Sequence, residues 1–339
     1  MNTVTLKVLS DHLGLTEGTV SRALNNYPDI SSKTRERVHL AARELGYRPN
    51  SNARRLATGQ AECVGYVLSR HGGNLSEPFL GEVLDGLAEA LSERNWDLTV
   101  AVALSGEDEL AVIRRLAQSG RVSGFVLSRT LTKDPRVDLL RAQNLPFVTH
   151  GRTAASDDHA WFDVDNEQAF RVAVDHLFDL GHRRIAHIAG PNAFNFARLR
   201  EIGYRAAMQA HKLDVPSDYV QVADMTDAGG ETATARLLSL DTPPTGLVCV
   251  SDRVALGAMK AAREAGLTIG RDLSIIGYDG LPLGEHANPP LTTMAQPLTQ
   301  SGRRLGEMLL ALVDGADRTT LQELRQADLV RRQSDGPPA

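Results

Sequence analysis

The chain has 339 residues, a formal net charge of −5 at pH 7 and two cysteines. A chain of this length is expected to fold into two or three domains, each with its own core. Cys63 and Cys249 have no His or Cys at metal-ligand spacing, which excludes a disulfide scaffold and a cysteine-built metal site. The N-terminus has no signal-peptide pattern, and no apolar run approaches the ~20 residues of a membrane helix. We therefore expect a soluble, cytoplasmic, multidomain protein.

Basic charge is concentrated near the N-terminus. Residues 1–60 carry nine Lys and Arg side chains against five Asp and Glu, a net charge of +4. The remaining 279 residues therefore carry a net charge of −9. A small basic module on a larger acidic body is typical of a protein whose N-terminal part binds a polyanion such as nucleic acid. The same asymmetry also lies within the ordinary variation of protein charge, so charge alone leaves both interpretations open.

The N-terminal residues predict three short helices. Thr5 precedes a short helical pattern that Gly14 ends, and Thr16 is a good N-cap for a second helix over residues 17–25. A third helix is expected over residues 34–45. Two short helices joined by a turn that contains Gly are typical of a helix-turn-helix. Ser31 or Ser32 is expected to cap the start of the third helix, and Gly46 to end it. The inward side chains of the three helices are expected to be Leu6, Leu9, Leu13, Val20, Leu24, Val38, Ala41, Ala42 and Leu45.

In a helix-turn-helix, the second helix enters the major groove, and its exposed N-terminal residues reach base edges. Here these residues are Glu17, Gly18 and Arg22, and Thr19 and Ser21 flank them. Arg makes a bidentate contact with guanine O6 and N7, Glu accepts from cytosine N4, and the flanking hydroxyls reach phosphate oxygens. Gly18 offers no side chain, so base recognition at that position is expected to be weak. The pattern by itself is equally compatible with a plain helical hairpin.

The sequence of residues 5–60 resembles the N-terminal module of the LacI/GalR family of bacterial transcription regulators along its whole length. The matching features follow the same order: T-L at 5–6, G at 14, T-V-S-R at 19–22, N at 25, K-T-R at 33–35, L-G-Y at 45–47, P-N at 49–50, A at 53 and L at 56. The resemblance implies a DNA-binding helix-turn-helix domain at residues 1–48. The expected DNA-binding residues are Thr5, Thr16, Glu17, Gly18, Thr19, Ser21, Arg22, Asn25, Ser31, Thr34, Asn50, Ala53, Arg54 and Leu56.

Residues 49–60 connect this domain to the rest of the chain. From the residues alone, the segment is an exposed basic linker. The family resemblance implies instead a hinge helix that is ordered on operator DNA, with Leu56 wedged into the minor groove. Ala53 is then small enough for two such helices to approach each other, and Arg54 and Arg55 face phosphate.

After Glu62 the spacing of the apolar residues changes. Short apolar runs alternate with amphipathic helical patterns in two series, which predicts two doubly wound α/β subdomains with parallel sheets. Ligands of such sheets bind beyond the carboxyl ends of the strands. The segments that follow the expected strands combine polar side chains with Phe79, Phe194, Phe196 and Met225. This composition predicts a pocket for a small molecule such as a sugar, although ordinary polar loops have a similar composition.

Residues from about 62 to 332 resemble the effector domain of the same family, which is similar to periplasmic binding proteins. The most specific matches are H-R-x-I-A at 182–186, G-P at 190–191, A-R-L-R at 197–200, S-D at 251–252, I-G-Y-D at 276–279 and P-L-T-T at 290–293. The resemblance implies that Arg200 anchors the effector with a forked contact. It also implies that Asp279 accepts hydrogen bonds from the effector, that Ser251 contacts it, and that Phe194 and Phe196 line the cleft.

Several positions of the expected effector site keep a second interpretation. Arg200 either anchors the effector or pairs with Asp279. Met225 stands where the family often has a stacking aromatic, and it is either part of the site or plain core. His150 stands where the family commonly has an acid, and it either donates to an effector hydroxyl, which makes binding sensitive to pH, or lies in a solvated loop. The expected effector-binding residues are Phe79, His150, Phe194, Phe196, Arg200, Met225, Ser251 and Asp279.

The resemblance also implies the division of the chain and its assembly. The expected parts are a helix-turn-helix domain at 1–48, a hinge at 49–60, and an effector-binding and dimerisation domain at 61–339, with one subdomain at about 62–161 plus 293–322 and the other at about 162–292 plus 323–332. No leucine heptads follow the second subdomain, so we expect a two-fold symmetric homodimer on a pseudo-palindromic operator rather than a tetramer.

The expected function is transcription regulation. The sequences of residues 19–28 and 52–59 are similar to those of regulators of α-glucoside or sucrose use. This similarity implies a repressor that a small sugar in the cleft releases from its operator. A purine or other non-sugar effector that acts as co-repressor is the alternative, and a sugar-binding transport component is a more remote one. G-x-S-x-G, Walker A, G-x-G-x-x-G and H-E-x-x-H motifs do not occur. We therefore expect no enzyme, no catalytic residue, no cofactor and no metal site.

Overall fold

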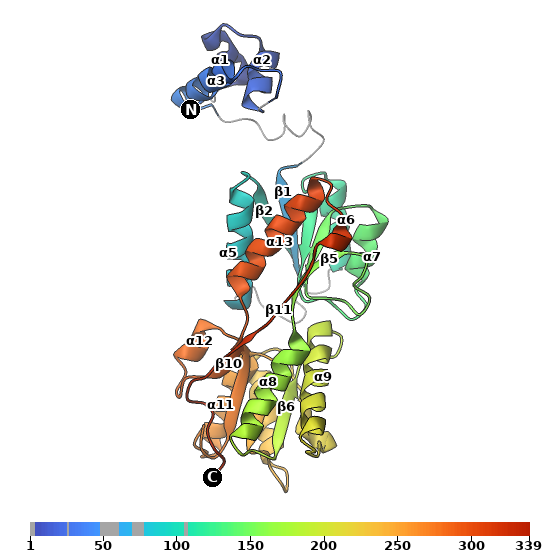
Figure 1. The fold of residues 1–339 in the computed structure, drawn as a ribbon, viewed down its shortest axis with the longest axis vertical. Helices are drawn as coiled ribbons and strands as arrows, with labels where there is room; N and C mark the ends of the chain where they lie inside the picture. The colour runs from blue at the N-terminus through green and yellow to red at the C-terminus, as the bar shows by residue number, and fades with distance from the viewer. Residues whose placement is uncertain (1–3, 26, 48–60, 70–77, 105–107) are drawn as a thin grey trace. The chain divides into compact units, whose positions relative to one another are not determined.

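The computed structural model describes residues 4–25, 27–47, 61–69, 78–104 and 108–339. The chain divides into an N-terminal unit, Met1–Glu62, and a second unit, Cys63–Ala339. Each unit contains its own buried apolar side chains. The ribbon in Figure 1 follows the chain from the blue N-terminal helices to the red C-terminal segments.

The N-terminal unit is built from α1, α2 and α3, which span Leu6–Leu13, Glu17–Leu24 and Ser32–Leu45. Each helix begins at a hydroxyl cap, because the side chains of Thr5, Thr16 and Ser31 each accept a hydrogen bond from a backbone N–H of the first turn. Gly14 and Gly46 end α1 and α3 at φ angles of 63° and 67°, which glycine adopts without strain. The three predicted helices and their caps are thus present, and α3 starts two residues earlier than residue 34.

The core of this unit is small. It consists of the buried side chains Leu9, Leu13, Val20, Ala23, Val38, Ala41 and Ala42. Leu24, predicted as an inward side chain of α2, is partly buried and packs against this core, and the structure adds Ala23, which is 0% exposed. Ala23 follows Val20 by three residues and shares its helix face, and its small side chain lets α2 pack closely on the other helices.

The second unit contains two six-stranded sheets. The first sheet has the order β11-β5-β4-β3-β1-β2, and all its pairings are parallel. Its strands are β1 (Cys63–Ser69), β2 (Asp97–Ala103), β3 (Gly124–Leu127), β4 (Phe147–His150), β5 (Ala160–Val164) and β11 (Gln322–Arg325). The short buried runs between helical patterns therefore form the parallel sheet that they predict.

The second sheet has the order β12-β10-β9-β8-β6-β7. Its pairings are parallel except for β10 with β12, which is antiparallel. Its strands are β6 (Ile185–Ala189), β7 (Val220–Val222), β8 (Gly246–Cys249), β9 (Ser274–Asp279), β10 (Thr292–Ala295) and β12 (Asp328–Val330). In both sheets the strand order reverses next to the first strand of the series, which is where doubly wound sheets bind ligands.

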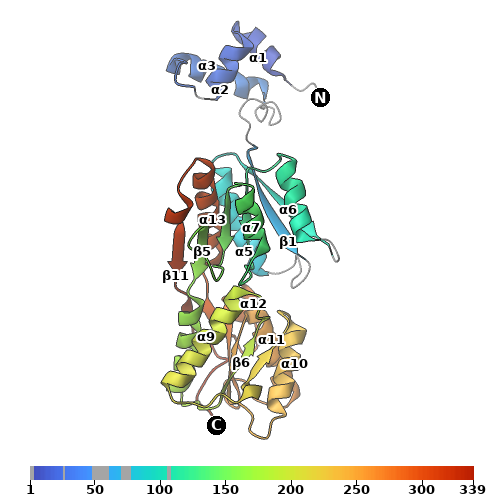
Figure 2. The ribbon, with the colours of Figure 1, turned by 90° about the vertical axis from the view of Figure 1, so that its right-hand side faces the viewer.

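Helices cover both faces of each sheet (Figures 1 and 2). On the first sheet, α5 (Pro78–Ser92) and α13 (Leu298–Val313) pack on one face, and α6 (Glu109–Gln118) and α7 (Pro135–Ala142) pack on the other. On the second sheet, α8 (Asn166–Asp179) and α9 (Asn195–Ala210) lie opposite α10 (Asp227–Leu238) and α11 (Asp252–Glu264). The short helix α12 spans Pro282–Glu285.

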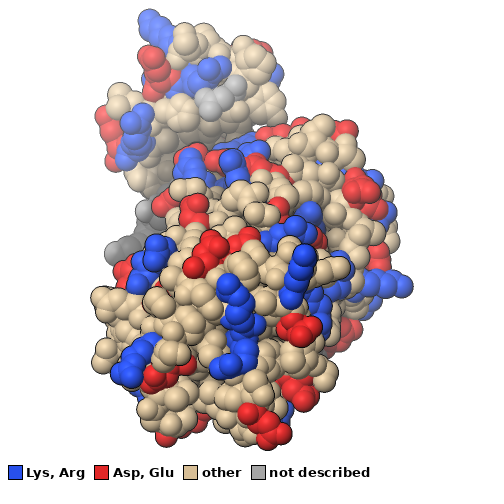
Figure 3. Space-filling view, turned by 60° about the horizontal axis from the view of Figure 1, so that its bottom comes forward, with Lys and Arg blue, Asp and Glu red and all other residues tan. Residues whose placement is uncertain are grey.

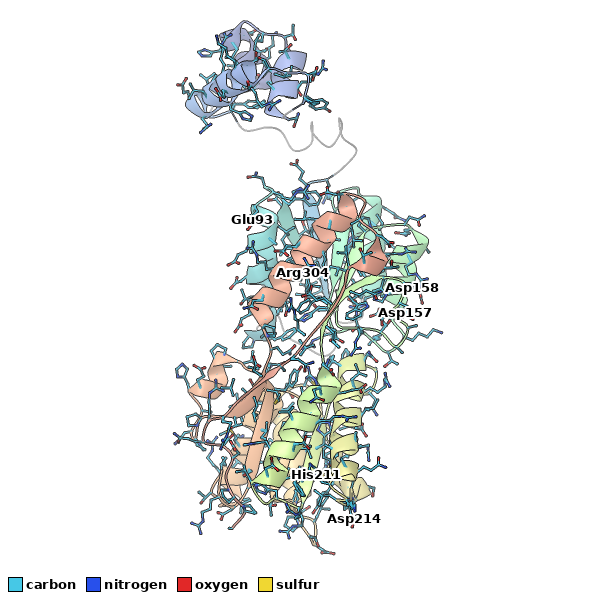
Figure 4. All side chains as sticks on the ribbon, in the orientation of Figure 1. Glu93, Asp157, Asp158, His211, Asp214 and Arg304 are labelled. Carbon is cyan, nitrogen blue, oxygen red and sulfur yellow. The ribbon has the colours of Figure 1, made fainter. Side chains whose placement is uncertain are left out.

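Helices α5 and α13 touch backbone to backbone. A Cβ on Gly86 of α5 would lie 1.8 Å from the carbonyl oxygen of Thr299, and a Cβ on Gly302 of α13 would lie 2.0 Å from that of Val83. These glycines therefore set the distance between the two helices. On the outer side, Arg304 of α13, labelled in Figure 4, donates to Glu323 of β11 at 2.7 Å and ties the helix to the edge strand.

The chain crosses between the two sheets three times, after β5, after β10 and after β11. The subdomain boundaries expected at about 161/162, 292/293 and 322/323 each fall three residues before the end of β5, β10 and β11, respectively. Strand β5 continues to Val164, and β11 at Gln322–Arg325 pairs with it in the first sheet. Strand β10 pairs with Ile276–Asp279 of β9, so residues 292–295 belong to the second sheet and not to the first. This pairing depends on contacts that the local pattern does not contain.

Two further observations concern the described residues as a whole. No helix among them is both long and apolar enough to cross a membrane. On the face of the second unit that Figure 3 presents, Lys and Arg side chains alternate with Asp and Glu, and neither sign forms a large patch. That face therefore has no extended basic surface of the kind that binds a polyanion.

Candidate functional site

The exposed side of α2 carries residues that the sequence predicts to face DNA. Glu17, Gly18 and Arg22 are exposed, and Thr19 and Ser21 are partly buried. The nearest atom that a Cβ on Gly18 would meet is 3.9 Å away, so the helix surface is open at this position. Exposed long side chains on both sides of a bare position leave room for the helix to lie close against a flat surface, as a recognition helix lies against base edges.

Several other predicted DNA-binding residues lie at helix ends. The hydroxyls of Thr16 and Thr19 are 2.9 Å apart at the start of α2, and those of Ser31 and Thr34 are 2.8 Å apart at the start of α3. Thr5 caps α1, and Asn25 Nδ2 at the end of α2 donates to Ser21 O at 2.9 Å. Helix N-termini favour anions such as phosphate, because their first N–H groups are unpaired and the helix dipole is positive there. The hinge residues Asn50, Ala53, Arg54 and Leu56 lie outside the described residues.

The second unit holds a cavity of about 710 Å³, including its open mouth, between the carboxyl ends of the two sheets. Of the predicted effector-binding residues, it is lined by Phe79, His150, Phe196, Arg200, Met225, Ser251 and Asp279. Phe194 is not among its lining residues. It is instead the residue that precedes α9, and its ring stacks on that of Phe196 at 5.4 Å between centroids. Phe194 therefore supports the cavity wall rather than facing the cavity.

Arg200 enters the cavity from α9 in a fixed pose. Its Nε donates to Asn166 Oδ1 at 2.7 Å, and one terminal nitrogen donates to Val250 O at 2.5 Å. The guanidinium carbon lies 3.5 Å from the ring centroid of Tyr278 and 4.7 Å from that of Phe196. Cation–π contact and hydrogen bonds together hold the side chain, which is only 5% exposed. A guanidinium held in this way is positioned to make a forked contact with a planar polar group of a ligand.

Asp279 takes its hydrogen bond from a neighbour that the sequence does not suggest. Its Oδ1 accepts from Gln296 Nε2 at 2.7 Å, and Gln296 also lines the cavity. No hydrogen bond joins Asp279 to Arg200 among the contacts of the described residues, so the alternative of a closed pair between them is not what the structure shows. Burial raises the pKa of Asp279 to about 7, although the charge of Arg200 opposes this shift.

His150 is the last residue of β4 and is buried, so the interpretation as a solvated loop residue is wrong. Its ring stacks on Phe79, with centroids 5.5 Å apart and planes 5° from parallel. Burial, together with the charge of Arg200, lowers the pKa of His150 to about 4. The imidazole is therefore neutral at neutral pH, and the expectation that it makes effector binding sensitive to pH finds no support near that pH.

Ser251 and Met225 each serve the fold as well as the cavity. Ser251 caps α11, because its Oγ accepts from Val254 N at 3.3 Å. Met225 lines the cavity and also packs against the core of the second sheet, so it is not plain core, and its contact with an effector stays a prediction.

The sequence missed several residues that line the cavity, which are Pro78, Arg129, Gly151, Asp163, Asn166, Arg253, Leu281 and Gln296. Arg129 and Arg253 follow β3 and β8, where sequence reasoning expects site residues but offers no reason to choose them. Gln296 follows β10, and it was missed because the sequence analysis predicts no strand there. Asp163 lies inside β5 and accepts from Arg152 Nε at 2.8 Å, and no sequence signal distinguishes it from a core residue.

Loops of the two subdomains are hydrogen-bonded to each other. Thr132 N–H donates to Ala193 O at 2.9 Å, and Asn195 N–H donates to Thr130 O at 3.0 Å. The side chain of Asn195 adds a hydrogen bond to Arg152 O at 2.8 Å. The subdomains are thus joined by hydrogen bonds here, in addition to the three chain crossings.

The cavity suits a polar organic ligand. Arg129, Arg200 and Arg253 supply donors, Asp279 and Gln296 supply acceptors, and the Phe79–His150 stack supplies a flat face. No group of three or more His, Cys, Asp or Glu that could hold a metal ion occurs in the part of the chain that the structure describes. Forked donors next to flat apolar faces are what a ligand with several hydroxyl groups requires.

Known proteins share the whole arrangement. The family described as "Bacterial regulatory proteins, lacI family" matches residues 11–50, and the "Periplasmic binding protein-like domain" matches residues 174–334. The HTH-type transcriptional regulator AglR of Rhizobium meliloti (strain 1021) is 41% identical over 338 residues, which cover 98% of this chain and 95% of AglR. The HTH-type transcriptional regulator CelR of Thermobifida fusca is 32% identical over 97% of this chain and 98% of its own length.

Solved structures agree over the full length. The transcriptional regulator CelR–cellobiose complex superposes with a TM-score of 0.76 at 30% identity, covering 98% of this chain and 99% of the other. The lac repressor dimer bound to operator and the anti-inducer ONPF superposes with a TM-score of 0.84 at 28% identity, covering 99% of this chain and 100% of the other. These relatives are regulators of transcription, which sets the enzyme alternative aside. The chain belongs to the lacI family of bacterial regulatory proteins and is a DNA-binding regulator of transcription.

Proposed function

We propose that the protein represses a sugar catabolic operon, and that a small sugar of the α-glucoside type releases it from a pseudo-palindromic operator. The observation that carries this proposal is the fixed Arg200 fork, which shares one cavity with the Asp279–Gln296 pair and the Phe79–His150 stack. The solved complex of the relative CelR with cellobiose supports a small sugar as the ligand.

The proposed mechanism is allosteric. A sugar that contacts both subdomains changes the angle between them, and the three chain crossings and the hydrogen bonds between their loops rearrange with it. The effector and the operator then favour different arrangements of the second unit, and each lowers the affinity of the other. The protein acts as a homodimer in the cytoplasm, where its operator is, and the operator-bound lac repressor dimer supports this assembly.

In the N-terminal unit, we propose that the exposed residues of α2 read bases, and that the capped helix ends contact phosphate. Arg22 and Glu17 are the base-reading side chains, and Thr5, Thr16, Thr19, Ser21, Asn25, Ser31 and Thr34 contact the backbone. The hinge residues Asn50, Ala53, Arg54 and Leu56 complete the contact in the minor groove.

The first experiment is a thermal-shift screen of the full chain against disaccharides, their phosphates, monosaccharides, purines and nucleosides. A ligand at ~100 times its Kd stabilises the domain that binds it by about 2.7 kcal/mol. We expect a shift with sucrose, maltose or trehalose. A shift with purines alone would replace the sugar by the co-repressor alternative, which the flat face of the Phe79–His150 stack also accommodates.

The matched variants are Arg200→Lys and Arg205→Lys, both on α9. Lys cannot form the fork that Arg200 forms, so the shift caused by the sugar should disappear at the same ligand concentration. Arg205 pairs with Glu201 on the surface at 2.7 Å, and its replacement should leave the shift intact. Binding of the same sugar should release the protein from an operator duplex obtained by selection from a random-sequence pool, measured by fluorescence anisotropy. A sugar that tightens operator binding would contradict the proposed direction.

A further inference from the structure

In the N-terminal unit, the arginine proposed to read bases is already paired within the protein. A terminal nitrogen of Arg22 is hydrogen-bonded to Asp29 Oδ2, and its guanidinium carbon lies 5.9 Å from the ring centroid of Tyr27. The side chains of Arg22 and Asp29 are 54% and 43% exposed. Because both remain in contact with water, the pair can open at small cost when another partner arrives.

The loop that carries Asp29 is held in place by its own hydrogen bonds. Tyr27 N–H donates to Arg22 O at 3.0 Å, and Ile30 N–H donates to Tyr27 O at 3.2 Å. The guanidinium of Arg35, on α3, donates to Tyr27 O at 3.0 Å and to Ile30 O at 3.2 Å. The backbone on both sides of Asp29 is thus fixed to α2 and α3, so the carboxylate stays beside Arg22.

We infer that Asp29 is an affinity-determining residue of the DNA-binding surface, because it competes with DNA for the guanidinium of Arg22. Guanine O6 and N7, and phosphate oxygens, bind the same N–H donors that the carboxylate occupies. The carboxylate also cancels a positive charge close to where the phosphates of DNA would lie. DNA must therefore displace Asp29 before Arg22 contributes fully to binding. This inference rests on the proposed role of Arg22 in contacting DNA.

The test is a double-mutant cycle on the full chain with four proteins, which are the wild type, Asp29→Asn, Arg22→Ala and the double variant. Affinity is measured by anisotropy for a mixed-sequence duplex and for the duplex obtained by selection, at several salt concentrations. We expect Asp29→Asn to tighten binding about two- to five-fold, which equals at most about 1 kcal/mol. In the Arg22→Ala background the same substitution should change affinity far less, since no guanidinium remains to be released.

Salt dependence provides a readout that a merely structural role of Asp29 would not move. Asp29→Asn should steepen the slope of log K against log salt by up to about 0.9, because the carboxylate no longer cancels one positive charge close to the phosphates. Glu36→Gln is the control, because it removes the same charge from an exposed position on α3 of the same unit. Glu36→Gln should change the affinity for DNA equally in the wild-type and Arg22→Ala backgrounds.

Two outcomes would overturn the inference. Equal gains from Asp29→Asn in both backgrounds would mean that Asp29 only repels phosphate and is not coupled to Arg22. Unchanged or weaker binding by Asp29→Asn would mean that the carboxylate orients Arg22 instead of competing for it. If Arg22→Ala alone leaves both affinities unchanged, the proposed role of Arg22 fails, and this result is separate from the coupling that the cycle measures.

Discussion

At the scale of single residues, the cavity is organised by a chain of buried polar contacts that starts outside it. Arg152 donates to Asp163, Asn166 Nδ2 lies 3.3 Å from Asp163 Oδ1, and Asn166 Oδ1 accepts from Arg200. Asp163 belongs to β5 of the first sheet, and Arg200 belongs to α9 on the second. The position of the arginine fork therefore depends on residues of both subdomains, with Asn166 as the link.

Replacing Asn166 by Ala should destabilise the second unit and weaken effector binding. The substitution leaves Arg200 Nε without its acceptor, and an unsatisfied buried donor of this kind costs about 1–3 kcal/mol. Urea unfolding and a ligand titration would measure the two effects. Asn144→Ala is the control, and it changes an exposed turn after α7 where the backbone φ is 52°. It tests whether a loss of stability elsewhere in the unit also weakens effector binding. Unchanged effector affinity in Asn166→Ala would contradict the positioning role.

The raised pKa of Asp279 predicts a pH dependence with a definite sign. The unfolded chain has the ordinary aspartate pKa near 4, whereas burial raises the pKa to about 7 in the folded state. Between these values the folded protein binds more protons than the unfolded one, so this carboxyl stabilises the fold most below about pH 4. Its contribution is lost as the pH rises towards 7, by up to about 1.4 kcal/mol per pH unit.

Urea unfolding of the wild type and of Asp279→Asn at several pH values would check this prediction. The difference in unfolding free energy between the two proteins isolates Asp279 from the other buried groups, such as His150, whose lowered pKa acts with the opposite sign. Relative to Asp279→Asn, the wild type should lose stability from pH 4 to 7. A difference that does not change with pH would contradict the assignment.

At the scale of elements, the first subdomain depends on the close contact of α5 with α13. The two helices come from opposite ends of the second unit's sequence, and they cover the same face of the first sheet (Figure 2). Their contact is close because Gly86 and Gly302 leave room for the facing backbone. The C-terminal part of the chain thereby completes the subdomain that the start of the second unit begins.

Gly86→Ala should destabilise the second unit, and Gly81→Ala should not. The new Cβ at residue 86 would overlap the carbonyl oxygen of Thr299, which forces the helices apart at a cost of about 1–3 kcal/mol. A Cβ at residue 81 of the same helix meets no atom within 4 Å among the described residues, so the higher helix propensity of Ala should stabilise by up to about 1 kcal/mol. Denaturant unfolding of both variants compares the two effects, and equal stabilities would argue against the close contact.

At the scale of the whole molecule, two units of opposite character share one chain. The first 60 residues carry +4 and the remaining 279 carry −9. The basic unit presents α2, and the acidic unit encloses the cavity. Charge therefore distinguishes the part that binds DNA from the part that binds the proposed effector. The mechanism that we propose couples the two through the conformation of the chain.

This coupling predicts a reciprocal effect that two independent titrations can measure. If the sugar weakens operator binding by a given factor, the operator must weaken sugar binding by the same factor, typically 5- to 150-fold or about 1–3 kcal/mol. Anisotropy gives the first factor, and calorimetry of the protein with and without operator gives the second. Tight binding of both ligands without any mutual effect would exclude the allosteric mechanism while leaving both sites intact.

The sequence by itself was sufficient for the features that local interactions decide. The caps at Thr5, Thr16 and Ser31 and the glycine that ends α3 are recognisable because each involves groups within one helical turn. The alternation of buried runs and helical patterns likewise predicts two parallel sheets with a site at their carboxyl ends. Most of the predicted effector residues consequently line a cavity that lies there.

Only the tertiary structure decided features that depend on pairing between distant segments. Strand β10 belongs to the second sheet because it pairs with β9, and this pairing brings Gln296 to Asp279. His150 is buried because Phe79, far away in the sequence, stacks on it. Local patterns report which residues can form a strand or a cap, but the choice of neighbour is set by burial and hydrogen bonding across the whole fold, which no short stretch of sequence contains.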